Sequence, residues 1–364
     1  MSRIKLNPEQ LLDELQQRAI NLVDGIQTLQ HLEAVEVGQT EHQCIYTEDR
    51  LRLLYYPALD NPAKDQAGNP IQSKRRPLLI VYALVNRPYI LDLQPDRSLI
   101  RALTSRGQPV YLIDWGYPVS TDAYLDLDDY INGYIDNCVE QVNLHAGVDR
   151  PNLLGVCQGG AFSLCYSAIN PDRIQSLTTL VTPVDFHTDD NLLGYLANRV
   201  DLNLARQANG NIDGGMLTQI YKALMPMRLG LLKELSMPTQ LGSPEAAQNF
   251  LRMERWINDS PDLAGTACCE FVDKFYQNNR FVNGGLQIGD ETVELKNYQG
   301  PLLNIFAARD HLVPPAASRA LGSLTGSQQY QEHELSGGHI GVFVGRHAQQ
   351  QLPDLVCQWL LEQG

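Results

Sequence analysis

The feature that most constrains the fold of this chain is the stretch at residues 153–161, LLGVCQGGA. It begins as an apolar run typical of a buried strand and continues as a run typical of a helix. Between the two runs, Cys157 lies midway between Gly155 and Gly159. Glycines at these positions remove the side chains that would clash in a very sharp turn. The pattern therefore predicts a strand–turn–helix unit with Cys157 at its tip.

A cysteine at such a tip is suited to nucleophilic chemistry. Its side chain would stand above the sheet at a helix N-terminus, where the positive end of the helix dipole favours a thiolate over a thiol. The alternative is a glycine-rich turn with a buried structural cysteine. The motif alone leaves both interpretations open.

Composition excludes several classes of protein. The formal net charge of −14 argues against a general nucleic-acid or anionic-membrane surface, which would need a basic patch. The seven cysteines are odd in number, scattered and without a Cys-x-x-Cys pair, which disfavours a disulfide framework or a zinc site and fits a reducing cytosol. We also see no signal-peptide run and no transmembrane-length apolar segment. We therefore expect a cytoplasmic protein without a bound metal.

Strand and helix patterns alternate along much of the chain, after a hairpin pattern at 43–57. Such alternation predicts a mostly parallel, doubly wound sheet. The expected strands are 78–84, 110–115, 152–156, 176–181, 302–307 and 329–335. The expected helices are 95–106, 127–145, one after Cys157, one from about 315 and one from about 347.

The alternation stops between residues 186 and 299, where no comparable strand pattern is found. Because this block precedes the last two strands, we expect a cap subdomain at 186–299 over the carboxyl edge of the sheet. The core would then comprise 41–185 and 300–364. Residues 1–40 would form an amphipathic helical segment, with one helix at 7–34 that either packs on its own domain or docks a partner.

An activated cysteine needs a base, and the base needs an orienting group. Asp310 follows the strand pattern that ends at Ala307, and His339 follows the last one, flanked by glycines. Both positions belong to the same sheet edge as Cys157. The order cysteine, aspartate, histidine matches the nucleophile–acid–histidine order of α/β-hydrolases. We therefore predict an α/β-hydrolase fold with a Cys157–His339–Asp310 triad, against the alternative that the last two residues only stabilise turns.

Supporting residues follow from the same fold. An oxyanion hole would use the backbone N–H of Gln158, after the nucleophile, and of Val85, after the first central strand. Gly155 and Gly159 would shape the turn, and His311 would support Asp310 structurally.

Motifs along nearly the whole chain resemble polyhydroxyalkanoate synthases, and most closely the short, two-component class III enzymes. The segments that carry the resemblance are 82–89 (YALVNRPY), 112–116 (LIDWG), 129–134 (DYINGY), 157–160 (CQGG), 181–185 (VTPVD), 249–254 (NFLRME), 275–279 (FYQNN), 310–315 (DHLVPP) and 338–341 (GHIG). The missing long N-terminal domain separates the chain from single-component synthases. Length alone does not separate it from the other two-component class.

The resemblance implies polymerisation of (R)-3-hydroxyacyl-CoA, with 3-hydroxybutyryl-CoA as the expected substrate, into polyester with release of CoA. No separate cofactor is expected, since coenzyme A is part of the substrate and a product. The resemblance also implies a non-catalytic second subunit, a homodimer of catalytic subunits and a location at the surface of cytoplasmic polymer granules.

Thiolate attack on a thioester exchanges one thioester for another, so the acyl group stays activated. His339 would take the proton of Cys157, while Asp310 would either orient His339 or deprotonate the 3-hydroxyl of the incoming unit. The cap would exclude water. Two alternatives remain: a cysteine-dependent thioesterase or esterase with the same triad, and a granule-associated scaffold without activity.

Overall fold

The computed structural model describes residues 35–59, 75–207, 210–224 and 243–363, together with six residues between positions 12 and 23. The chain divides into two compact units. Unit 1 comprises Met1–Val37 and Gly215–Ser260, and unit 2 comprises Gly38–Gly214 and Pro261–Gly364.

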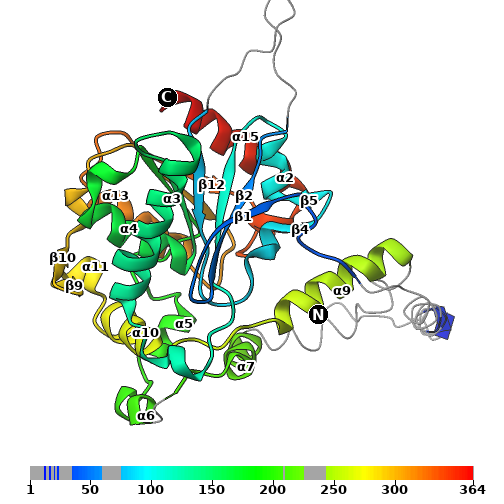
Figure 1. The fold of residues 1–364 in the computed structure, drawn as a ribbon. Helices are drawn as coiled ribbons and strands as arrows, with labels where there is room; N and C mark the ends of the chain where they lie inside the picture. Colours follow the sequence, from blue (N-terminus) through cyan, green and yellow to red (C-terminus); the bar gives the residue numbers. More distant parts are fainter. Residues whose placement is uncertain are drawn as a thin grey trace, which may run out of the picture. The chain divides into compact units, whose positions relative to one another are not determined.

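Unit 2 is built around an eight-stranded sheet in the order β1-β2-β6-β3-β7-β8-β11-β12 (Figure 1). The pairs β1–β2 and β2–β6 are antiparallel, and all other neighbours are parallel. This confirms the predicted mostly parallel sheet. The strands are β1 Gln43–Glu48, β2 Leu51–Tyr56, β3 Leu78–Val81, β6 Val110–Asp114, β7 Asn152–Val156, β8 Ser176–Leu180, β11 Leu302–Ala307 and β12 Tyr330–Leu335.

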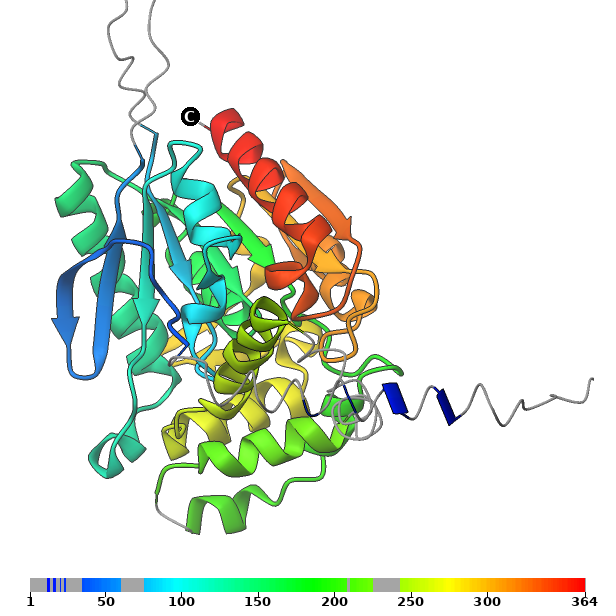
Figure 2. The same ribbon diagram turned by 90° about the vertical axis from the view of Figure 1, so that its right-hand side faces the viewer.

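Burial explains why the central strands have few charged residues. All residues of β3, β6, β7, β8 and β11 are buried, as expected for parallel strands covered on both faces. The hairpin β1–β2 and strand β12 lie at opposite edges (Figure 2). Strand β12 exposes charged side chains at Glu332 and Glu334, a pattern that discourages edge-to-edge pairing.

Helices cover both faces of this sheet (Figure 1). Helices α3 (Asp136–Ala146) and α4 (Gln158–Ile169) lie on one face, and α2 (Leu99–Thr104) and α15 (Arg346–Glu362) lie on the other. Shorter helices of unit 2 are η1 Pro88–Leu91, η2 Ser120–Tyr124, the π-helix η3 Asp129–Ile135, η4 Pro171–Arg173, α5 Leu192–Ala197, α6 Leu202–Gln207, α10 Gly265–Phe271, the π-helix η6 Val272–Gln277, α11 Arg280–Asn283, η7 Leu295–Asn297, α12 Pro315–Arg319, α13 Leu321–Leu324 and α14 Gly341–Val344.

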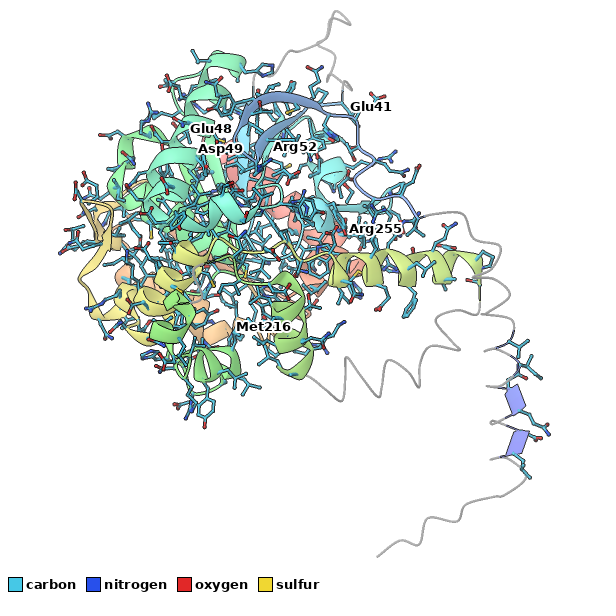
Figure 3. All side chains as sticks on the ribbon, turned by 60° about the horizontal axis from the view of Figure 1, so that its bottom comes forward. Glu41, Glu48, Asp49, Arg52, Met216 and Arg255 are labelled. Carbon is cyan, nitrogen blue, oxygen red and sulfur yellow. The ribbon has the colours of Figure 1, made fainter. Side chains whose placement is uncertain are left out.

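Side chains at the turn of the β1–β2 hairpin attach this edge element to the helices on one face of the sheet. Figure 3 marks Glu48 and Asp49 at the end of the hairpin. The Asn137 amide donates to the Glu48 carboxylate at 2.9 Å, and the Tyr134 hydroxyl donates to Asp49 at 2.6 Å. These bonds stabilise an edge element that would be marginal as an isolated hairpin.

Unit 1 contains α9 (Pro244–Asn258) and most of α7 (Gly214–Leu224). Helix α9 begins with Ser243 as its N-cap and Pro244 in its first turn, both favoured at a helix start. The guanidinium groups of Arg252 and Arg255 donate to the backbone carbonyls of Glu36 and Val35. These bonds join α9 to the end of the N-terminal segment.

The structure describes the predicted N-terminal helix and the predicted cap only in part. Of the helix predicted at 7–34, only Leu12, Asp13, Gln16, Gln17, Ile20 and Val23 are described, and they are helical; the rest lies outside the described residues. Part of the predicted cap, 215–260, belongs to unit 1, while 186–214 and 261–299 belong to unit 2.

Two short hairpins were not predicted: β4 (Asp92–Gln94) with β5 (Arg97–Ser98), and β9 (Leu286–Ile288) with β10 (Glu291–Val293). The predicted strands 78–84 and 176–181 also end early. Strand β3 ends at Val81, and the Tyr82 carbonyl accepts a hydrogen bond from the Trp115 indole instead of continuing the ladder. Within the described ranges, no helix is long and apolar enough to cross a membrane.

Candidate active site

The predicted sharp turn is present, with Cys157 at its tip. Cys157 directly follows β7 and is the N-cap of α4, with φ 53° and ψ −119°. A positive φ is rare for a residue with a side chain and typical of strained positions at functional sites. The Cys157 N–H donates to the Leu180 carbonyl at 2.9 Å, which attaches the tip to the end of β8.

Glycines are required around this turn because backbone and side chains approach them closely. A Cβ at Gly155 would lie within 2.5 Å of the Gly160 Cα atom. A Cβ at Gly159 would overlap the carbonyl oxygen of Val81, and one at Gly160 would overlap the Thr182 side chain. The roles predicted for Gly155 and Gly159 in shaping the turn therefore have a steric basis.

We expect Gly159→Ala to lower the free energy of unfolding by about 3 kcal/mol, because the new methyl group forces β3 and α4 apart. Urea unfolding would measure this. Gly133→Ala is the matched control, since the nearest atom to its added Cβ is 3.9 Å away. Equal stability of the two variants would contradict the steric explanation.

Asp310 and His339 lie together, as predicted. The His339 Nδ1 and Asp310 Oδ2 atoms are 2.7 Å apart, and both side chains are buried. The other carboxylate oxygen, Oδ1, accepts the N–H groups of Leu312 and Val313, each at 2.9 Å. Asp310 is thereby fixed in one orientation, with a single oxygen directed at the imidazole.

Backbone hydrogen bonds hold the two loops against each other. The Ala308 N–H donates to the Leu335 carbonyl, and the Arg309 N–H donates to the Gly337 carbonyl. Gly337 has a φ of 123°, a backbone conformation that residues with a side chain rarely adopt. The flanking glycine noted in the sequence thus has a conformational role.

The charge of Cys157 acts on His339, which indicates that the two side chains lie near each other. Burial lowers the pKa of His339, but the charges of Asp310 and Cys157 and its hydrogen bond to Asp310 outweigh this, so the pKa is raised well above 6.5. A raised imidazole pKa favours imidazolium, the form that pairs with a thiolate. The three predicted residues therefore meet at one sheet edge in an arrangement suited to covalent catalysis.

The two predicted oxyanion donors also lie at this edge. Val85 is in the loop after β3, and Gln158 is the first residue of α4. Among the residues that the structure describes, neither backbone N–H has a hydrogen-bond acceptor. Both are thus available to a bound group.

Sequence reasoning missed the contribution of the Gln158 side chain. Its Oε1 atom accepts the Leu84 N–H at 3.1 Å. The two residues are 74 positions apart, and no sequence signal links them. The supporting role of His311 stays a prediction. The described part of the chain contains no cluster of three or more His, Cys, Asp or Glu side chains that could bind a metal.

Comparison with known proteins agrees with this geometry. Residues 76–346 match a family described as alpha/beta hydrolase fold, and residues 8–103 match the N-terminus of poly-beta-hydroxybutyrate polymerase (PhaC). The poly(3-hydroxyalkanoate) polymerase subunit PhaC of Allochromatium vinosum is 49% identical over 362 residues, covering 100% of both chains. The chain belongs to the PhaC family.

A second PhaC subunit, from Thiocystis violacea, is 45% identical and covers 100% of this chain and 99% of its own. Among solved structures, a thermophilic esterase from Thermogutta terrifontis has a TM-score of 0.51 at 12% identity, covering 89% of this chain and 99% of its own. That likeness shows the fold alone. The PhaC relatives, in contrast, match the chain end to end.

Proposed function

We propose that this chain polymerises (R)-3-hydroxyacyl-CoA, with 3-hydroxybutyryl-CoA as the first substrate to test, and releases CoA. The observation that carries the proposal is the end-to-end similarity to PhaC subunits at 49% identity. The Cys157–His339–Asp310 arrangement supplies a chemical route. The enzyme is then an acyltransferase that requires no cofactor beyond the coenzyme A of its substrate.

In the first step, the Cys157 sulfur attacks the thioester carbonyl carbon. The bond between that carbon and the CoA sulfur breaks, and the CoA thiolate leaves with the proton held by His339. In the second step, the 3-hydroxyl oxygen of an acyl group attacks the Cys157 thioester. An ester bond forms, the carbon–sulfur bond to Cys157 breaks, and His339 receives the hydroxyl proton.

For Asp310, we propose the orienting role. Its Oδ1 is occupied by two backbone N–H groups and its Oδ2 by His339. This arrangement favours one tautomer of His339, with Nδ1 protonated and Nε2 facing the sulfur. A direct role as base on the 3-hydroxyl would require Asp310 to give up one of these contacts.

We further propose that the chain acts as a homodimer of catalytic subunits, with a non-catalytic second subunit, at the surface of cytoplasmic polyester granules. The class III resemblance of the motifs supports this. Deletion of residues 1–34 is expected to weaken co-purification with the second subunit. Undiminished co-purification would contradict a docking role for that segment.

The product of 3-hydroxybutyryl-CoA distinguishes the proposed polymerase from a thioesterase with the same triad. We expect CoA release together with insoluble polymer, measured by thiol titration and by weighing or depolymerising the precipitate. Release of equimolar free 3-hydroxybutyrate without polymer would refute the polymerase and identify a thioesterase.

A further inference from the structure

The hydrogen bond from the Leu84 N–H to the Gln158 side chain joins the two loops that carry the proposed oxyanion donors. Leu84 lies in the loop after β3, and Gln158 opens α4. The donor is a backbone N–H and the distance is 3.1 Å, so the accepting atom must be the carboxamide oxygen. The bond is partly buried, where it is shielded from competing water.

Two further anchors flank this loop. On one side, the Trp115 indole donates to the Tyr82 carbonyl at 2.9 Å. On the other side, the Arg87 guanidinium forms an ion pair with Asp114 at 2.7 Å and donates to the Gly116 carbonyl at 2.5 Å. Both anchors attach the loop to the end of β6. The Gln158 side chain attaches the loop to helix α4.

Between these anchors, the chain turns sharply at Val85 and Asn86. Asn86 has a φ of 59°, in the left-handed region that asparagine tolerates better than most residues. The Leu84 N–H is engaged by Gln158, and the next N–H along the chain, that of Val85, has no acceptor among the described residues. A small rotation of Leu84 would redirect the N–H of Val85.

We propose that the Gln158 side chain is a positioning residue that aims the Val85 N–H at the acyl oxygen on Cys157. Gln158 would then supply one oxyanion donor through its backbone and set the other through its side chain. This inference rests on the proposed acyl transfer and concerns its first step, in which the thioester oxygen becomes negatively charged. A neutral carboxamide suits this position, because a carboxylate would repel that charge.

Gln158→Met tests the proposal, because methionine has a similar length and shape but no oxygen to accept the Leu84 N–H. Two reactions of Cys157 are compared. Acylation by 3-hydroxybutyryl-CoA, followed as CoA release in a single turnover, passes through an oxyanion. Alkylation by iodoacetamide consumes the same thiolate but forms no oxyanion. The control is Gln175→Met. Gln175 lies just before β8, and its side chain donates a hydrogen bond to the Gln363 carbonyl that the variant also loses.

We expect the acylation rate of Gln158→Met to fall about 10- to 100-fold, somewhat less than the loss of a whole oxyanion donor. Its alkylation rate should stay within about twofold of the wild type, as should both rates of Gln175→Met. An unchanged acylation rate would overturn the proposal. A parallel fall of both rates would also overturn it, since the side chain would then act on the thiolate or on folding.

The comparison of acylation and alkylation rates does not depend on whether the final product is polymer or free acid. Acylation is shared by a polymerase and a thioesterase, so free acid in place of polymer would refute the proposed function while leaving the acylation-to-alkylation ratio interpretable. A normal ratio in a polymer-forming Gln158→Met enzyme would refute only the positioning role.

Discussion

Replacing Cys157 by alanine is expected to abolish polymer formation and CoA release, a loss of about 10⁶-fold by comparison with other covalent triads. No other group at the turn can carry the acyl chain. The measurement is steady-state CoA release from 3-hydroxybutyryl-CoA, together with mass spectrometry of the enzyme after a single turnover. Wild type should gain one acyl group, and the variant none.

Cys165→Ala is the matched control, since this second cysteine lies on the same helix α4 but is fully buried. Burial raises the pKa of Cys165 far above its ordinary value, so its thiol stays neutral. We expect normal acylation in Cys165→Ala. An acylated Cys157→Ala enzyme would show that another residue is the nucleophile.

Cys157→Gly and Cys157→Ala both remove the sulfur but should differ in their free energy of unfolding. Glycine relieves the strained positive φ of 53° at position 157, whereas alanine retains it. We therefore expect Cys157→Gly to unfold in urea with a free energy about 1 kcal/mol higher than that of Cys157→Ala. Both variants should be inactive. A less stable glycine variant would argue against stored strain at the turn.

Asp310→Asn is expected to slow acylation by about 10³- to 10⁴-fold while preserving the fold. The asparagine oxygen can still accept the N–H groups of Leu312 and Val313, which leaves its amide nitrogen facing His339. That nitrogen donates, so it selects the tautomer of His339 with its proton on Nε2. This tautomer cannot accept a proton from Cys157.

The time course of this variant distinguishes the two roles considered for Asp310. An orienting role predicts slow acylation in a single turnover. A direct role on the 3-hydroxyl predicts normal acylation followed by failure to elongate, so that the acyl-enzyme accumulates. Normal single-turnover acylation in Asp310→Asn would therefore contradict the orienting role.

The same substitution should change the response to pH. The charge of Asp310 helps to raise the pKa of His339 above 6.5, so imidazolium survives to a higher pH in wild type than in the variant. A raised folded-state pKa contributes stability that is complete below the unfolded pKa and is lost as pH rises through the folded pKa. The stability advantage of wild type over Asp310→Asn should thus shrink as pH increases from 6 upward, as measured by urea unfolding.

The sequence contained enough information to predict the sheet and the side chains that meet at the candidate site. Apolar runs of strand length occur where the parallel strands are buried on both faces, and Cys157 and Asp310 each follow such a run. His339 instead follows the exposed edge strand β12. Because parallel strands place their carboxyl ends at one edge, strand order and residue type were sufficient to bring the three together.

Other features depend on contacts that no local pattern encodes. Val181 is β-branched and follows a strand, yet its φ is 45°, and its N–H donates to the Ile305 carbonyl. The Gln158–Leu84 bond likewise joins residues from two separate strand–helix connections. The boundaries of the two units were also beyond prediction, since helical patterns occur in both.

An isolated antiparallel β-bridge pairs Ile212 with Leu263 at the two ends of the segment that lies outside unit 2. Each residue donates its N–H to the carbonyl of the other, and the Gly214 N–H donates to Asp262, so the chain leaves unit 2 and re-enters it at one place. Segments whose ends lie side by side can be exchanged or inserted with little cost to the host fold. We therefore expect that the segment between Gly214 and Pro261 can be exchanged without rearranging the sheet of unit 2.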